Sequence, residues 1–134
     1  MLGNARIAAI VPVSDLERAI EFYGSTLGLR LIDQNADIPD NPEAVFEAGD
    51  GTIFVYKSAA AGQGRATEAG FVVDDLDTAM AGMRERGVTF EEYDLPGLKT
   101  VDGIADVGFA LAAWLVDPHG NSIGLLQFKH AGPS

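Results

Sequence analysis

The stretch of sequence that decides the fold occurs twice, as Val13-Ser14-Asp15-Leu16-Glu17-Arg18-Ala19 and, sixty residues later, as Val73-Asp74-Asp75-Leu76-Asp77-Thr78-Ala79. Each copy follows a short apolar run, which predicts a strand, and opens a segment whose apolar residues recur at helical spacing. The second or third residue of each copy can cap the helix with its side chain. Both predicted helices end at a glycine, Gly28 or Gly87, where a positive φ costs little. The chain therefore contains two diverged copies of one supersecondary unit.

Composition limits the possible partners of the chain. Its 134 residues suit one compact domain, and 47% hydrophobic residues exclude a disordered chain. A formal charge of −11, with only nine Lys and Arg, argues against nucleic acid and anionic membrane surfaces as partners. The absence of cysteine excludes disulfides, thiolate nucleophiles and zinc sites built on sulfur. No signal sequence or membrane-spanning run is recognised, so we expect a cytoplasmic protein.

Alternation and turn residues predict the remaining elements. Strands are expected at residues 5–13, 29–33, 44–48, 52–57, 67–73, 88–93, in a segment running to 116, and at 121–128, with helices at about 15–27 and 75–86. Pro12 should lie near a strand end or on a sheet edge. We expect a first module at about 5–58, a linker at 59–66, a second module at about 67–128 and a tail at 129–134, all within a single domain spanning 1–134.

Three further motifs accompany the repeated stretch: Phe22-Tyr23 before Leu27-Gly28, Arg86-Gly87-Val88 after the second helix, and the turn Asp117-Pro118-His119-Gly120-Asn121. With the repeat, their order resembles the vicinal oxygen chelate superfamily, which includes glyoxalase I, extradiol dioxygenases and antibiotic-binding proteins of the bleomycin-resistance type. The resemblance covers about residues 5–128. It implies an α+β fold of two tandem βαβββ modules, whose curved eight-stranded sheet surrounds a cavity with the helices outside.

Enzymes of that superfamily hold a divalent metal through four inward side chains, and the resemblance assigns those positions here to Ala8, Phe54, Glu68 and Gly124. Only Glu68 offers a donor atom. A catalytic metal needs about three protein ligands to fix its geometry. We therefore predict that the protein binds no metal and uses no cofactor.

Strand alternation then identifies the neighbours of these positions on the inner face. The predicted ligand-binding set is Ala8, Ile10, Phe54, Tyr56, Glu68, Gly70, Gly124 and Leu126. This mostly apolar set suits an apolar or aromatic organic ligand, although the same residues can equally be core filling. The predicted register puts Ala113 beside Gly124, and it therefore leaves Trp114 under a helix. Arg65 is a possible structural partner of Glu68, because a buried carboxylate must be paired, hydrogen-bonded or protonated.

Two functions fit these residues. The first is a binding protein that sequesters an antibiotic or another natural product. The second is a metal-free enzyme, such as an isomerase, epimerase or lyase, in which Glu68 is the general base and Tyr56 assists. A vestigial cavity with a structural or regulatory role is a third possibility. In each case we expect a homodimer, because members of the fold commonly pair their modules and open sheet edges need covering.

Overall fold

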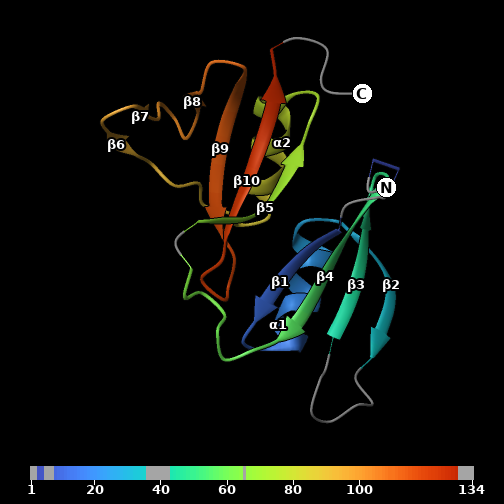
Figure 1. Ribbon diagram of the computed structural model, residues 1–134. Helices are drawn as coiled ribbons and strands as arrows, with labels where there is room; N and C mark the ends of the chain where they lie inside the picture. Colours follow the sequence, from blue (N-terminus) through green and yellow to red (C-terminus); the bar gives the residue numbers. More distant parts are fainter. Residues whose placement is uncertain (1–2, 5–7, 36–42, 65, 130–134) are drawn as a thin grey trace. The chain divides into compact units, whose positions relative to one another are not determined.

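Figure 1 shows the computed structural model, which describes residues 3–4, 8–35, 43–64 and 66–129. Within these residues the chain forms two compact units. The first contains the residues up to Glu68 together with Asp117–Asn121, and the second contains Ala69–Val116 and the residues from Ser122 onward. A short segment from the second half of the sequence therefore belongs to the first unit.

The first unit contains one four-stranded sheet and one helical segment. Its elements are β1 (Ala8–Val13), α1 (Leu16–Ile20), the π-helical turn η1 (Glu21–Thr26), β2 (Arg30–Asn35), β3 (Glu43–Ala48) and β4 (Gly51–Lys57). The strand order is β1-β4-β3-β2, with β1 parallel to β4 and the other pairs antiparallel. Pro12 lies in the edge strand β1, as predicted, where its missing N–H costs no ladder bond.

The core of the first unit lies between this sheet and the helical segment (Figure 1). Asp15 is the N-cap, because its carboxylate accepts the backbone N–H of Arg18 at 3.3 Å. The predicted helical stripe is buried at Leu16, Ala19 and Tyr23. It packs with alternate residues of three strands, all buried: Val11, Val13, Ala44, Phe46, Ile53 and Val55. Alternation therefore leaves the other residues of these strands on the opposite, open face.

The second unit repeats the plan, with a shorter strand at one edge of its sheet. Its elements are β5 (Thr67–Val72), α2 (Leu76–Glu85), β6 (Asp94–Leu95), β7 (Leu98–Lys99), β8 (Ala105–Asp106), β9 (Ala110–Val116) and β10 (Ser122–Phe128). The four-stranded sheet has the order β5-β10-β9-β8, and β6 and β7 form a separate hairpin. Asp75 caps α2 by accepting the N–H of Thr78 at 3.1 Å, and Gln127 Oε1 accepts the N–H of Leu76 at 2.7 Å.

The predicted strand at residues 88–93 is wrong. Within it only Phe90 forms a bridge, to Leu115, and the short strand β8 pairs with β9 instead, Ala105 lying opposite Ala112. The segment is drawn into a loop because the N–H of Tyr93 donates to Thr100 Oγ1 at 2.7 Å. The N–H of Thr100 donates to the carbonyl of Tyr93 at 2.9 Å. These two bonds close the base of the β6–β7 hairpin.

The predicted register around Gly124 is also wrong. Gly124 lies opposite Trp114, whereas Ala113 lies opposite Leu125. The error came from the length of the turn: five residues, Asp117–Asn121, are closed by a hydrogen bond from the Asp117 N–H to the Asn121 carbonyl at 2.9 Å. Trp114 consequently shares a face with Gly124 and does not lie under α2.

The predicted fold class is confirmed: the chain is mixed α+β, with two four-stranded sheets, each covered by a helix on one face (Figure 1). No helix in the described part of the chain has the length and apolar character needed to cross a membrane.

Candidate functional site

The open face of the first unit's sheet carries four of the predicted ligand-binding residues. Ala8 and Ile10 on β1 share this face with Phe54 and Tyr56 on β4, because Ile10 lies opposite Phe54 and Pro12 opposite Tyr56. The Ile10 side chain is 61% exposed. The rings of Phe54 and Tyr56 lie 6.4 Å apart, centroid to centroid. These four residues form an apolar and aromatic strip, beside which β3 places Glu43 opposite Tyr56 and Glu47 opposite Thr52. The role of the strip in ligand binding stays a prediction.

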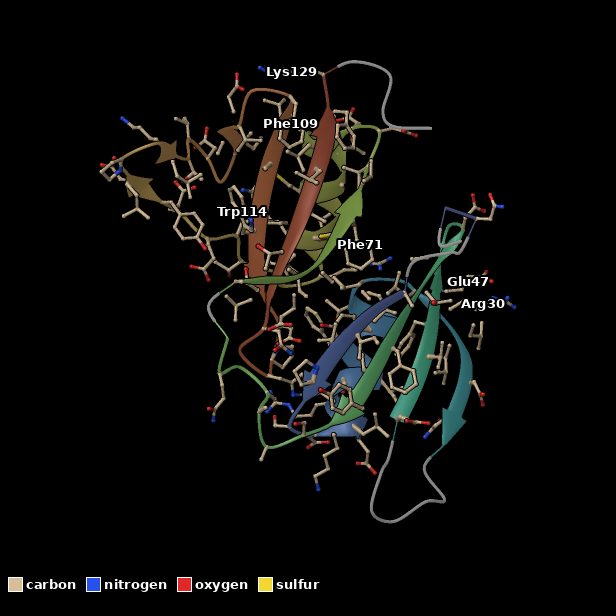
Figure 2. The ribbon with its side chains drawn as sticks, in the orientation of Figure 1. Arg30, Glu47, Phe71, Phe109, Trp114 and Lys129 are labelled. Atoms are coloured by element: carbon tan, nitrogen blue, oxygen red, sulfur yellow. The ribbon has the colours of Figure 1, made fainter. Side chains whose placement is uncertain are left out.

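The face of the second unit's sheet that lies opposite α2 carries Gly124, which is buried, and Leu126, which is half-buried, of the predicted set. Trp114, which is labelled in Figure 2, lies opposite Gly124, and Ala112 lies opposite Leu126. A Cβ atom added at Gly70, the predicted residue on β5, would lie 3.9 Å from the carbonyl oxygen of Gly124. The two glycines are therefore neighbours. The sequence could have placed Trp114 opposite Gly124, but only if the turn between the two strands had been counted as five residues, Asp117–Asn121.

Glu68 lies near the start of β5, beside Gly64, and its predicted role in ligand binding stays a prediction. Its carboxylate is half-buried, and Oε1 would lie 3.0 Å from a Cβ atom at Gly64. Its charge also contributes to the raised pKa of Tyr23, after the larger effects of burial and of Asp117. No hydrogen bond or ion pair joins Glu68 to another described residue. Arg65, the predicted structural partner, lies outside the described residues.

The turn Asp117–Asn121 supplies a buried polar network to the first unit. The Asp117 carboxylate accepts the Tyr23 hydroxyl at 2.7 Å and the Asn121 side-chain amide at 2.9 Å. It also accepts the backbone N–H groups of His119 at 2.9 Å and Asn121 at 2.8 Å. The Asn121 amide donates in addition to the carbonyl of Pro12 at 2.6 Å. With four donors, the carboxylate is satisfied although it is only 4% exposed.

Gly62 allows the 58–64 segment to lie against this turn. Its φ is +73°, and a Cβ atom there would clash with the carbonyl oxygen of His119. Its N–H donates to Asn121 Oδ1 at 3.3 Å. A glycine is therefore required at this position both by the backbone conformation and by the close approach.

Ser14 and His119 form a contact that the sequence did not suggest. His119 Nδ1 lies 2.9 Å from Ser14 Oγ and accepts the Ser14 backbone N–H at 3.2 Å. Because Nδ1 is an acceptor, the neutral ring carries its proton on Nε2, which is buried and makes no hydrogen bond within the described chain. Burial lowers the pKa of His119 and Arg18 lowers it further, while Asp117 and Asp15 act in the opposite direction.

This contact is not a catalytic triad. Asp117 accepts the backbone N–H of His119 and makes no bond to the ring, so this carboxylate does not orient the imidazole as it would in a triad. The contact between His119 and Ser14 instead holds the turn Asp117–Asn121 against Ser14, the residue that precedes the N-cap Asp15.

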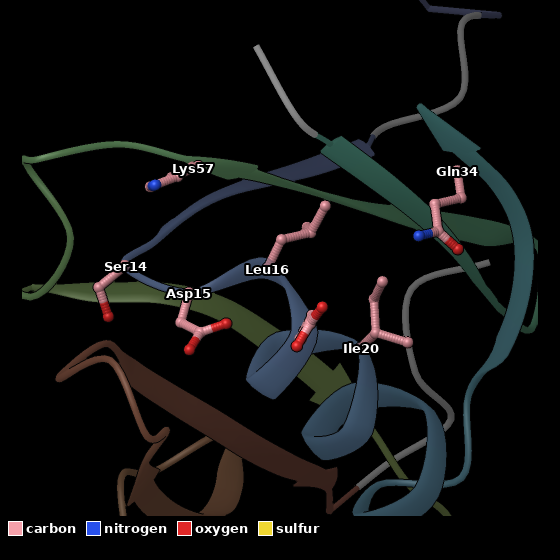
Figure 3. Close-up of a pocket in the computed structure, with 7 residues that line it drawn as sticks. Ser14, Asp15, Leu16, Ile20, Gln34 and Lys57 are labelled. Atoms are coloured by element: carbon pink, nitrogen blue, oxygen red, sulfur yellow. The ribbon is translucent and has the colours of Figure 1, made fainter. Parts of the chain in front are cut away.

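A pocket of about 450 Å³ opens beside the start of α1 (Figure 3). It is lined by Ser14, Asp15, Leu16, Glu17, Ile20, Gln34 and Lys57. None of the predicted ligand-binding residues belongs to it. Leu16 and Ile20 provide apolar surface, and one ammonium and two carboxylates surround it. The Asp15 carboxylate already accepts the Arg18 N–H, so its capacity for a ligand is reduced.

The residues at the four expected metal positions do not fit a divalent ion. Ala8 and Phe54 lie on the open face of the first unit's sheet and Gly124 is buried in the second unit's sheet, and none carries a donor side chain. Among the described residues, no group of three or more His, Cys, Asp or Glu could hold an ion. Glu68 would be a single protein ligand, too few for a specific site.

Comparison with known proteins relates the whole fold to one superfamily. A model of the Glyoxalase/Bleomycin resistance protein/Dioxygenase superfamily matches residues 5–125. No curated protein sequence matches the chain. Among solved structures, UcmS2 has a TM-score of 0.72 at 18% identity, with 92% of this chain and 98% of UcmS2 covered.

Two similar structures come from Streptomyces sp. CB03234. A glyoxalase/bleomycin resistance protein has a TM-score of 0.65 at 25% identity, with 92% of this chain and all of the other covered. TnmS3, an antibiotic binding protein, has a TM-score of 0.66 at 24% identity, with 96% of this chain and 99% of TnmS3 covered. These structures have the same fold as this chain.

Proposed function

Because the chain belongs to the Glyoxalase/Bleomycin resistance protein/Dioxygenase superfamily, we propose that it binds a small apolar or aromatic organic molecule without a metal ion. The observation that carries this proposal is the exposure of large apolar side chains on β1 and β5, the edge strands of the two sheets. Ile10 in the first unit is 61% exposed and Val72 in the second is 65% exposed. Soluble proteins reserve extended apolar surface for ligands and partners.

The ligand-binding residues that we propose are those predicted from the sequence, with Trp114 added. They are Ala8, Ile10, Phe54, Tyr56, Glu68, Gly70, Trp114, Gly124 and Leu126. The similarity to TnmS3, an antibiotic binding protein, supports sequestration of an antibiotic or natural product as the purpose of binding. The proposed assembly is a homodimer, for which sedimentation should give about twice the chain mass of 14.1 kDa.

A thermal-shift screen against aromatic natural products and flavins tests the binding function. A ligand at a hundred times its dissociation constant should stabilise the protein by about 2.7 kcal/mol. A library that shifts nothing argues against the proposal. Elemental analysis tests the metal-free part: close to one Zn, Ni, Fe or Mn per chain, retained after mild chelation, would contradict it.

A metal-free isomerase, epimerase or lyase is the second candidate, with Glu68 as general base and Tyr56 assisting. It rests on the half-buried Glu68 carboxylate, which has no hydrogen bond or ion pair to another described residue. Glu68→Gln separates the two functions, because it keeps the shape and removes the basic lone pair. In a binding protein it should weaken binding of a donor-bearing ligand by about 1–3 kcal/mol, with no turnover to lose. In an enzyme, turnover should fall by roughly two to four orders of magnitude.

A further inference from the structure

The pocket beside the start of α1 takes no part in the proposed function. It has a volume of about 450 Å³, and residues of the β1–α1 junction, α1, β2 and β4 line it (Figure 3). This volume lies within the range of small-molecule sites. Phe54 and Tyr56, by contrast, belong to the opposite face of the first unit's sheet. The pocket is therefore a candidate for a separate site.

The pocket lies where two rows of core side chains end in polar residues. Lys57 follows Ile53 and Val55 on one face of β4, and both of those residues are buried under the helical segment. Gln34 on β2 lies opposite Ala44, which is buried on the same face of the sheet. Lys57 and Gln34 are both exposed. The helical segment therefore covers the apolar part of these rows and leaves their polar ends open.

The second copy of the repeat closes the corresponding place. Lys57 pairs with the last residue of β1. In the second unit the N–H of Val73 donates to the carbonyl of Leu126, so the next residue, Gln127, is the counterpart of Lys57. Gln127 Oε1 accepts the N–H of Leu76 at 2.7 Å. Lys57 has no acceptor atom, and it makes no hydrogen bond or ion pair with a described residue. Only the second copy thus uses its own side chain at this place.

The lining of the pocket carries both signs of charge around an apolar wall. Leu16 and Ile20 supply the apolar wall. The Glu17 carboxylate and the Gln34 amide, like the Lys57 ammonium, make no hydrogen bond or ion pair with another described side chain. A ligand with charge of one sign would be repelled by part of this lining, whereas a zwitterion can place each of its charges beside the opposite one.

We propose that this pocket binds a short zwitterionic peptide with apolar side chains, its ammonium beside Glu17 and its carboxylate beside Lys57. The apolar side chains of the peptide cover Leu16 and Ile20, which removes apolar surface from water. The site is independent of the proposed function, because the pocket and the apolar strip of β1 and β4 lie on opposite faces of one sheet. The two ligands therefore bind without competing.

Calorimetry with three related peptides tests the recognition of each charge. Leucyl-leucine carries both terminal charges, its amide lacks the carboxylate, and N-acetyl-leucyl-leucine lacks the ammonium. Leucyl-leucine should bind about threefold more tightly than either analogue, because an exposed ion pair contributes little. In NMR spectra the backbone resonances of residues 14–20, 34 and 57 should shift on binding, and those of Ile10 and Phe54 should stay unchanged.

Two variants assign each preference to one side chain. Lys57→Met keeps the stem and removes the charge, so it should bind leucyl-leucine and its amide with equal Kd. Glu17→Gln should bind leucyl-leucine and the N-acetyl peptide with equal Kd. The matched controls are Asp77→Asn, at the position of Glu17 in the second copy, and Lys99→Met on β7, and both should keep both preferences. All four side chains are exposed, so the variants should fold like the wild type.

Three results would overturn the site. Leucyl-leucine that does not bind the wild type at millimolar concentration excludes a peptide pocket. Equal Kd values for the three peptides exclude recognition of a zwitterion. Preferences that persist in Lys57→Met and Glu17→Gln, or resonance shifts at Ile10 and Phe54 instead of residues 14–20, place the binding elsewhere. The proposed function is tested separately by the thermal-shift screen and stands or falls without these results.

Discussion

The two copies of the repeated stretch begin alike and end differently. In both copies the third residue caps the helix, Asp15 in the first and Asp75 in the second. After five residues the first helix widens into the π-helical turn η1, whereas α2 continues as an α-helix for ten residues. Capping depends on one local side chain and survives divergence, whereas the later course of each helix depends on what it packs against.

The side chains seven residues after the helix start show that dependence. The first copy has Tyr23, whose hydroxyl donates to Asp117, and the second has Met83, whose side chain has no hydrogen-bond donor. The edge strand farthest from β1 or β5 in each sheet differs as well: β2 has six residues and its counterpart β8 has two. One copy is thus fixed by buried hydrogen bonds, and the other uses apolar packing and loops.

The largest expected effect is the loss of Asp117. Asp117→Ala leaves the buried donors of Tyr23, His119 and Asn121 without their acceptor, so the free energy of unfolding should fall by roughly 3 kcal/mol or more. Denaturant unfolding measures it. Met83→Leu, at the position equivalent to Tyr23 in the second copy, is the control and should cost less than about 1.5 kcal/mol. Equal losses in the two variants would abolish the proposed contrast between the copies.

The next effect isolates one hydrogen bond of the network. Tyr23→Phe removes the hydroxyl that donates to Asp117 and keeps the ring, so unfolding should become easier by about 2 kcal/mol. Tyr56→Phe makes the same change on the open face, where no hydrogen bond of the hydroxyl is seen with a described residue, and should stay within about 0.5 kcal/mol. A loss for Tyr56→Phe as large as for Tyr23→Phe would show that burial in the network is not the cause.

A smaller effect should appear as a dependence of stability on pH. The folded state lowers the pKa of His119 below its ordinary 6.5, chiefly by burial, so the unfolded chain binds the proton more readily. The contribution of His119 to stability is therefore complete above about pH 6.5 and is lost as the pH falls from there towards the lower folded pKa. Unfolding curves at several pH values should lose this slope in His119→Asn. An unchanged slope would exclude His119 as its source.

The smallest effect concerns the exposed cap of α2. Hydrogen bonds from Thr78 lower the pKa of Asp75, so its stabilising contribution is present above its unfolded pKa and is lost as the pH falls through the folded one. Asp75→Asn should remove this acid-range dependence and leave the behaviour near pH 6 unchanged. NMR titration of the Asp75 carboxyl carbon measures the pKa directly, and a value at or above 3.8 would contradict the shift.

Local rules predicted the parts of the fold that depend on neighbours in sequence. The caps, the terminal glycines and the alternation of β1 and β4 were correct because each involves a single turn or a regular strand. The strand expected at 88–93 failed although Val88, Thr89 and Phe90 have high strand propensity. Two bonds between Tyr93 and Thr100 overrode that propensity.

The candidate site was predicted in part for the same reason. Ile10, Phe54 and Tyr56 share a face because regular strands fix it, whereas Trp114 was misplaced by one residue in the length of a turn. The contact between Ser14 and His119 joins residues 105 positions apart, and no sequence pattern announces it.

The membership of Asp117–Asn121 in the first unit has a consequence for synthesis. The ribosome makes the first unit's strands and helix early. Tyr23, however, finds its hydrogen-bond partner in Asp117, which is 94 positions later, and Pro12 finds its partner in Asn121, which is 109 positions later. The amino-terminal half therefore leaves the exit tunnel with an unfilled place in its core, and its completion waits until nearly the whole chain has emerged. Long-range closure of this kind slows folding. A nascent chain stalled before Asp117 should remain a substrate for chaperones and proteases.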